Sequence, residues 1–165
     1  MKRNKVNINK LKSQELRGLF QQTHSKDFFP HVRAQALERA LDEERLINFE
    51  KGKGVVVWKL CKQKSTTYNN RPGDFKIEYI VVDENYLGKG ISSSLFKHCI
   101  ELAKSKNCPR LILTVRDDNK RMQKFVNKMG MKLEFKTDVT SQTSGNVIRY
   151  RCYYMKLSKT KNFFG

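Results

Sequence analysis

The sequence predicts a mixed α/β domain: a central parallel βαβ unit flanked by antiparallel strands, with helices on both faces of a mainly antiparallel sheet. Two observations lead to this fold class. Apolar runs at residues 76–82 and 111–115 enclose a glycine-containing loop and an amphipathic segment, which is the order of a parallel crossover unit. On either side, short runs separated by polar turns predict antiparallel hairpins. The whole chain, residues 1–165, is expected to form a single domain.

Two helices are predicted near the start of the chain. In the first, residues 9–23, Asn9 is suited to cap the helix, and apolar side chains recur near a helical period at Leu11, Leu16, Leu19 and Phe20. The second is expected to begin at Pro30, because a proline in the first turn lacks only an N–H group that the helix leaves unpaired. Its apolar stripe consists of Val32, Ala36, Leu37, Ala40 and Leu41.

A hairpin and a loop are predicted between these helices and the crossover unit. Residues 47–49 and 55–61 are the two apolar runs of the hairpin, and the turn between them contains two glycines. Residues 63–73 are polar and end in Pro-Gly, which favours a loop.

The crossover unit is followed by one more helix and a second hairpin. Residues 119–129 have the pattern of a helix, and Gly130 is suited to end it. Residues 131–137 and 147–157 predict two antiparallel strands joined by a polar segment.

Charge is the strongest compositional signal. The chain has 34 Lys and Arg residues against 16 Asp and Glu, a formal net charge of +18. A domain this basic is attracted to polyanions such as nucleic acid or ribosomes, although a basic surface that only favours solubility is the alternative. No apolar run is long enough to span a membrane, and no apolar signal core follows the first residues. We therefore expect a soluble cytoplasmic protein with no membrane partner.

A metal site is not indicated by the sequence. The four cysteines, Cys61, Cys99, Cys108 and Cys152, include no Cys-x-x-Cys pair, and the three histidines do not complete a zinc site. These cysteines are expected to be reduced thiols in or near the core.

A candidate anion site follows the strand at residues 76–82. Glycines at positions 88 and 90 allow backbone N–H groups to converge and a ligand to approach closely, and the start of the next helix favours negative charge. The loop lacks the Gly-Lys-Ser/Thr of a Walker A motif and the third glycine of a dinucleotide fingerprint. An ordinary turn is the alternative. The backbone that would hold the anion belongs to Leu87, Gly88, Lys89, Gly90, Ile91 and Ser92.

Residues 80–91, IVVDENYLGKGI, resemble the acetyl-CoA loop of the GNAT acetyltransferases, which ends a strand with V-D-P-x-Y-R-G-K-G and continues into a helix. The family's Gln/Arg-x-x-Gly-x-Gly/Ala pattern falls on Asn85, Gly88 and Gly90, where Asn85 departs from Gln or Arg. A second block, residues 113–131, is similar to the family's strand–Asn–helix–Gly-Phe element, with Asn119 and Gly130 in place and Met131 instead of Phe. The resemblance covers about residues 76–135.

This resemblance implies a cofactor and a direct reaction. Two central parallel strands splay apart in the family, and acetyl-CoA or another acyl-CoA lies in the gap. Its pantetheine pairs with the backbone of the strand before the loop, here Ile80, Val81 and Val82, and Asn119 contacts it or orders its turn. An acceptor amine then attacks the thioester, while strand backbone near Val81 or Val82 stabilises the oxyanion.

Glu78 is the candidate general base, acting directly or through water, because it lies on the strand that precedes the loop. An exposed strand glutamate paired with a lysine is the alternative, and Asp74 is a weaker candidate base. Family members often carry a tyrosine at the position of Val126 to protonate the leaving sulfur. Valine cannot do so. Either the thiolate leaves unprotonated, catalysis is weak or lost, or another hydroxyl donates, from Tyr79, Tyr86, Ser92 or Tyr153.

The resemblance places the acceptor site between the first two helices and the last hairpin. Phe28 and Phe29 can stack on a base or cover an amine, while His31 and Arg33 can contact phosphate or relay a proton. An apolar staple at an exposed first turn is the alternative. On the last strand, the charged Arg151 and the aromatic Tyr153 alternate and are expected to face the acceptor. A sheet edge packed on helices is the alternative, because it would show the same pattern.

We therefore expect an acetyl-CoA-dependent N-acetyltransferase, monomeric or homodimeric, acting on an amine on or near an anionic macromolecule: nucleic acid, ribosome or protein. Two alternatives stay open. The basic charge and the missing tyrosine are similar to the Mom-type bacteriophage DNA-modification proteins, which have a related fold and altered chemistry. The other alternative is a non-catalytic module that keeps the CoA fold to bind nucleic acid.

Overall fold

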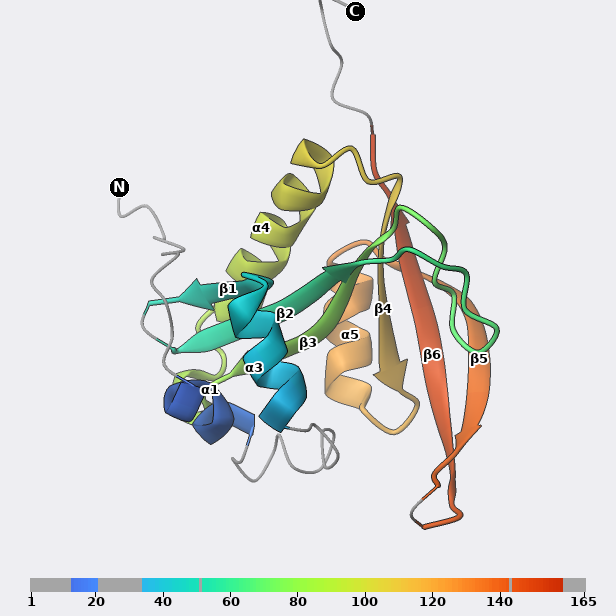
Figure 1. Ribbon diagram of the computed structural model, residues 1–165, viewed down its shortest axis with the longest axis horizontal. Coiled ribbons are helices and arrows are strands. Elements are labelled where there is room, and N and C mark those ends of the chain that lie inside the picture. Colours follow the sequence, from blue (N-terminus) through green and yellow to red (C-terminus); the bar gives the residue numbers. More distant parts are fainter. Residues whose placement is uncertain (1–12, 21–33, 51, 143, 159–165) are drawn as a thin grey trace, which may run out of the picture. The chain divides into compact units, whose positions relative to one another are not determined.

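The structure is a computed structural model that describes residues 13–20, 34–50, 52–142 and 144–158 (Figure 1). Contacts between Cα atoms divide the chain into two compact units. The first contains the described residues of Met1–Lys59 and Ile77–Cys99, and the second those of Leu60–Lys76 and Ile100–Gly165. The six strands form one sheet with the order β1-β2-β3-β4-β6-β5.

The first unit is built on a helical pair and a hairpin. Helices α1, Ser13–Phe20, and α3, Ala34–Asp42, pack against each other. Strands β1, Leu46–Phe49, and β2, Gly54–Leu60, are antiparallel, with Leu46 opposite Val57 and Phe49 opposite Gly54. The apolar faces of these elements meet in one core cluster: Leu16, Leu19, Phe20, Leu37, Ala40, Val55, Val57 and Val81.

Strand β3, Phe75–Val82, leads into the glycine loop and then into α4, Ile91–Ser105. The loop begins with a short 3-10 helix, η1, at Glu84–Tyr86, which the sequence did not predict. Gly54 lies against the start of α4, because a Cβ atom at this glycine would come within 2.6 Å of the Ile91 side chain and 3.0 Å of Leu95. The β1–β2 turn is therefore packed directly against the helix that follows the glycine loop.

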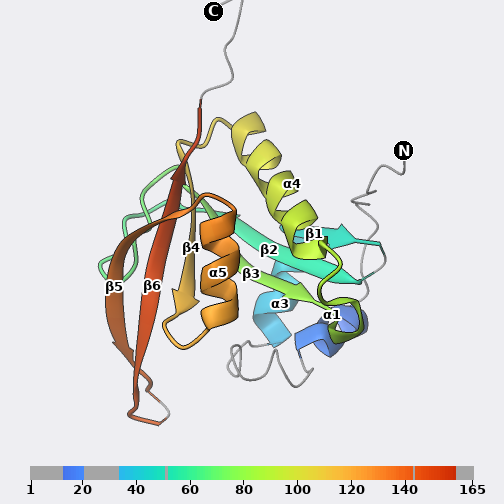
Figure 2. The same ribbon diagram turned by 180° about the vertical axis from the view of Figure 1, so that it is seen from behind.

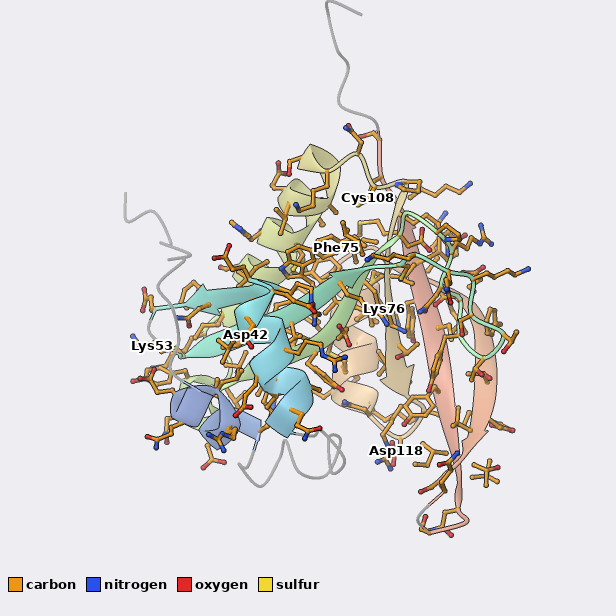
Figure 3. All side chains as sticks on the ribbon, viewed as in Figure 1. Asp42, Lys53, Phe75, Lys76, Cys108 and Asp118 are labelled. Carbon is orange, nitrogen blue, oxygen red and sulfur yellow. The ribbon has the colours of Figure 1, made fainter. Side chains whose placement is uncertain are left out.

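The second unit contains β4, Arg110–Arg116, helix α5, Lys120–Lys128, and a long hairpin of β5, Lys132–Thr140, and β6, Val147–Lys156. Strand β6 is antiparallel to both β4 and β5, as Figure 1 shows. The parallel ladder of β3 with β4 consists of two pairs, Phe75 with Leu111 and Lys76 with Ile112. Both of these β3 residues are labelled in Figure 3.

The sequence-based prediction of the fold is confirmed: the sheet is mixed, with three antiparallel pairs and one parallel pair recorded in its register. For the strands and for α5, whose ends lie within the described residues, the observed boundaries fall within a few residues of the predicted ones. The positive φ of +91° at Gly130 fits its predicted place after α5. Asn9 and Pro30, which were predicted to begin the two N-terminal helices, lie outside the described residues.

A buried ionic cluster ties the loop between β2 and β3 to the sheet of the second unit. The Arg110 guanidinium donates to both carboxylate oxygens of Asp74, at 2.7 and 3.2 Å, to Glu134 at 3.0 Å and to the Asn69 carbonyl at 2.7 Å. The Arg110 side chain is 8% exposed and that of Asp74 is 1% exposed. Asp74, the weaker candidate base, thus has a structural role in this cluster.

Replacing Arg110 with methionine is expected to lower the free energy of unfolding by about 3–5 kcal/mol, because Asp74 would keep a buried charge without its partner. Urea denaturation measures this change. The double variant Arg110→Met/Asp74→Asn should recover part of the loss, since it removes both charges. A single variant within about 1 kcal/mol of the wild type would show that the cluster does not hold the loop.

Candidate active site

The glycine loop is ordered at its start by a side-chain cap. The Asp83 carboxylate accepts a hydrogen bond from the Asn85 N–H at 2.9 Å, and the Asp83 carbonyl accepts one from the Tyr86 N–H at 2.9 Å. The Asp83 N–H itself donates to the Lys53 carbonyl at 2.8 Å. The loop therefore leaves β3 in a fixed direction and is tied to the β1–β2 turn.

Gly88 and Gly90 shape the rest of the loop. Both have φ of +76°, a conformation that side chains disfavour, and a Cβ atom at either would meet nothing within 4 Å. The Gly90 carbonyl accepts from the Ser94 N–H at 3.1 Å, which is the first hydrogen bond of α4. Among the described residues, the space beside these two glycines, just before the 15-residue helix α4, is therefore open.

Two lysines carry positive charge next to this loop. The Nζ atom of Lys53 lies 4.9 Å from the centre of the Tyr86 ring, and that of Lys89 lies 5.3 Å from it. Lys53, labelled in Figure 3, also forms a 2.8 Å ion pair with Glu50, whose hydrogen bond raises the pKa of the ammonium group. Cations beside the N-terminus of a helix make the loop suitable for a phosphate group.

These residues fit the pyrophosphate of an acyl-CoA. Within the described ranges, the space at the two glycines is open, and a side chain there would fill it. Leu87, Gly88, Lys89, Gly90, Ile91 and Ser92 all belong to this stretch of the first unit. The three strand residues of the expected pantetheine site, Ile80, Val81 and Val82, lie at the end of β3 in the same unit.

Glu78, the candidate base, lies on β3 in an ion pair. Its Oε1 atom accepts a hydrogen bond from Nη1 of Arg45 at 2.9 Å, and the same nitrogen donates to the Trp58 carbonyl at 2.7 Å. The Glu78 side chain is 26% exposed. The carboxylate is therefore oriented by Arg45, a partner that the sequence did not reveal, and remains accessible to solvent.

The candidate hydroxyl donors have different surroundings. Tyr79 packs edge-to-face on Phe20 with ring centres 5.4 Å apart, beside the core cluster of the first unit. The Tyr86 ring lies near both Lys53 and Lys89, and Ser92 is in the first turn of α4. Val126, which stands where the family often has tyrosine, is completely buried in the second unit.

Asn119 caps helix α5. Its side-chain oxygen accepts a hydrogen bond from the Met122 N–H at 3.1 Å. The buried Gln123 amide supports the same turn, donating to the Arg116 carbonyl at 3.2 Å and the Asp117 carbonyl at 2.8 Å. The turn before α5 is therefore held by side chains at both of its ends.

Two of the residues expected to contact the acceptor, Arg151 and Tyr153, lie on β6. Arg151 donates to Asp117 at 2.6 Å, a bond that lowers the pKa of Asp117 and raises that of Arg151. The Tyr153 side chain is 1% exposed and belongs to the buried part of the second unit. The other four, Phe28, Phe29, His31 and Arg33, lie outside the described residues.

The structure also adds residues that sequence reasoning missed. Arg45 and Lys53 lie before β1 and in the β1–β2 turn, yet they contact Glu78 and Tyr86. No spacing in the sequence links them to the glycine loop. A positive side chain close to a glycine turn was a weak signal, since the chain has 34 lysines and arginines.

Metal ligands and membrane-spanning helices were sought among the described residues. No group of three His, Cys, Asp or Glu side chains there could hold a metal ion. Among the same residues, no helix has the length and apolar character needed to cross a membrane. The cytoplasmic location remains a prediction.

Solved structures share this fold across nearly their whole length. Ard1 from Thermoplasma volcanium is 15% identical, with a TM-score of 0.70 over 92% of this chain and 97% of that one. The ribosomal-protein-S18-alanine N-acetyltransferase from Escherichia coli is 16% identical, with a TM-score of 0.67 over 93% and 92%. A NatC complex bound to Gag peptide and CoA is 14% identical, with a TM-score of 0.70 over 91% and 93%. No curated protein matches the sequence.

A sequence model of the acetyltransferase (GNAT) family matches residues 13–131, which include the glycine loop and the α5 turn. The match covers well over half of the 165 residues, and the shared fold agrees with it. An acyl-CoA is the donor substrate that this family uses. The chain therefore belongs to the acetyltransferase (GNAT) family and is an N-acetyltransferase.

Proposed function

We propose that this enzyme transfers an acetyl group from acetyl-CoA to an amine on or near an anionic macromolecule, nucleic acid or a ribosomal or other protein. The observation that carries the cofactor assignment is the glycine loop. Both glycines have positive φ, both are open to a ligand, and they lead directly into a 15-residue helix. The acceptor assignment is supported by the net charge of +18.

The residues of the loop would hold the acyl-CoA by its phosphates. N–H groups of residues 87–92 are the donors, and the Lys53 and Lys89 side chains add positive charge. The backbone of Ile80, Val81 and Val82 would align the pantetheine. A backbone N–H group near Val81 or Val82 would stabilise the oxyanion. Asn119 would keep the β4–α5 turn in shape, as its cap on α5 indicates.

In the proposed reaction, the acceptor nitrogen attacks the thioester carbonyl carbon. A carbon–nitrogen bond forms, the carbon–sulfur bond breaks, and CoA leaves as a thiolate. The amine proton passes to Glu78, directly or through water. Nη1 of Arg45 donates to Oε1 of Glu78, and Oε2 is the oxygen proposed to take this proton. His31 is proposed as an alternative proton relay.

The leaving thiolate has no tyrosine at position 126 to protonate it. The surroundings of the other hydroxyls support some of the candidate donors more than others. Tyr86 and Ser92 belong to the loop that would hold the cofactor, whereas Tyr153 is buried in the second unit. Departure as the free thiolate, or protonation by Tyr79, Tyr86 or Ser92, is therefore proposed instead of protonation by Tyr153.

The acceptor is best identified by offering the enzyme several macromolecules. Wild-type protein is incubated with acetyl-CoA and, separately, with ribosomal proteins, peptides with free N-termini, duplex DNA and RNA, and mass spectrometry of each acceptor follows. We expect one acetyl group to be added to at least one of them. Transfer to a free polyamine only would contradict the macromolecular acceptor.

The same incubation separates catalysis from mere binding. A non-catalytic module would be stabilised equally by acetyl-CoA and by desulfo-CoA and would acetylate none of the acceptors. A DNA base carrying a group other than acetyl would favour the chemistry of the Mom-type proteins. Either result would overturn the proposed reaction.

A further inference from the structure

Helix α5 presents a continuous cationic face. Of its nine residues, Lys120, Arg121, Lys124, Asn127 and Lys128 are exposed, whereas Gln123 and Val126 are buried against the second unit. The exposed face therefore carries four positive charges and one amide, and no carboxylate occurs anywhere in the helix. Figure 2 shows α5 on the near side of β4 in that unit.

This arrangement does not stabilise the helix itself. Lys120 and Lys124 are four residues apart, as are Lys124 and Lys128, and like charges at this spacing destabilise a helix. Lys120 and Arg121 lie in the first turn, where the helix dipole favours negative charge, and no acidic residue is present in that turn. Helix stability therefore does not explain the row of positive charges on α5, which points to a partner outside the chain.

Nearby carboxylates are already used by other cations. Asp117 pairs with Arg151 at 2.6 Å and with Lys136 at 3.8 Å, and Asp118, labelled in Figure 3, pairs with Arg116 at 2.8 Å. In the part of the chain that the structure describes, none of the four cations of α5 forms an ion pair. Besides the hydrogen bond from Arg151, Lys120 helps to lower the pKa of Asp117 from beyond ion-pair distance. No ion pair within the described residues neutralises Arg121, Lys124 or Lys128. The charge of this face is therefore available to an anionic partner.

The chemistry of the face identifies the partner. Four residues of helix correspond to a rise of about 6 Å, so Lys120, Lys124 and Lys128 form a row of evenly spaced charges. A polymer with regularly repeated negative charges matches this row better than a single phosphate does. The exposed residues of α5 include no aromatic ring on which an unpaired base could stack. A sugar–phosphate backbone with its bases turned inward fits this surface.

We propose that the exposed face of α5, formed by Lys120, Arg121, Lys124 and Lys128, binds the phosphate backbone of a nucleic-acid duplex. The inference rests on the proposed function in one respect: the bound duplex is the anionic macromolecule on or near which the acceptor amine lies. It also relocates the expected contact, because Arg151, the β6 arginine first expected to meet the acceptor, is neutralised by Asp117.

The test uses full-length protein, no acyl-CoA, and fluorescence anisotropy of labelled duplex DNA and duplex RNA at several salt concentrations. The variant Lys120→Gln/Lys124→Gln/Lys128→Gln removes three charges and keeps side chains that favour helix. Its affinity near physiological salt should fall by about tenfold or more, and the slope of log K against log salt should become shallower by about three.

The matched control, Lys62→Gln/Lys64→Gln/Lys97→Gln, removes the same charge from exposed lysines outside α5. It should bind duplex nearly as the wild type does. An equal loss in both variants would overturn the proposal in favour of diffuse attraction. So would stronger binding to single strands or to vesicles of anionic lipid, or a fall in acetyl-CoA affinity with duplex binding unchanged.

Failure of this inference and failure of the proposed function have different signatures. Acetyl transfer that occurs without any duplex binding overturns the α5 surface and leaves the reaction intact. Duplex binding that depends on α5, in a protein that transfers no acetyl group, supports the surface and overturns the reaction.

Discussion

Placing a glutamate at Gly88 or at Gly90 is expected to abolish acetyl-CoA binding. The new carboxylate would occupy the open surface where the pyrophosphate is proposed to lie, and it would compete for the same N–H donors. Both glycines have φ of +76°, so the substitution also strains the backbone. Calorimetric titration with acetyl-CoA measures the effect.

The matched control for this experiment is Gly145→Glu. Gly145 has φ of +70° in the β5–β6 turn, and a Cβ atom there also meets nothing within 4 Å. The control therefore carries the same charge and similar strain at a position with no proposed ligand. It should bind acetyl-CoA as the wild type does. Undiminished binding in both loop variants would exclude the loop as the phosphate site.

The variant Glu78→Gln is expected to lower turnover by roughly 10²–10⁴-fold, the usual effect of losing a general base. Acetyl-CoA affinity should change little. A glutamine oxygen can still accept the hydrogen bond from Arg45, so the orientation of the side chain is kept while its basicity is lost. The wild-type rate should rise with pH as the acceptor amine loses its proton.

Two measurements separate this role from a structural one. Glu101→Gln, an exposed change on α4, should leave turnover unchanged. Thermal unfolding of Glu78→Gln shows whether loss of the charge pair with Arg45 has weakened the fold. If Glu78→Gln turns over at the wild-type rate, the amine proton is accepted by His31 or by bulk water and not by Glu78. Asp74 is a poor substitute, because Arg110 binds both of its carboxylate oxygens.

The fold could be predicted from the sequence because its signals are local. The strand at residues 76–82, the glycine loop and the helix after it are continuous in the chain. The strand is a short apolar run, the helix has a helical period of apolar residues, and the glycines mark the loop. The same holds for α5, where Asn119 and Gly130 bound the helix as expected. The 3-10 turn at Glu84–Tyr86 escaped prediction, because it depends on a hydrogen bond from one backbone N–H to Asp83.

Contacts between distant residues could not be predicted. Arg45 reaches Glu78 across 33 positions, and Arg110 reaches Asp74 across 36. With 34 lysines and arginines in the chain, many partners were equally plausible for each carboxylate. Alternation along β6 likewise failed to distinguish the exposed Arg149 from the buried Tyr153, because burial depends on which elements cover each face.

The central claim is that this protein uses acetyl-CoA to acetylate an amine, and the stoichiometry of the reaction tests it most directly. CoA thiol released and acetyl groups gained by the acceptor are measured in one incubation, with Gly90→Glu and Glu78→Gln in parallel. The account predicts one thiol for each acetyl group, no reaction with Gly90→Glu, and a slow but stoichiometric reaction with Glu78→Gln. Wild-type protein that binds acetyl-CoA but releases no thiol with any acceptor would contradict it.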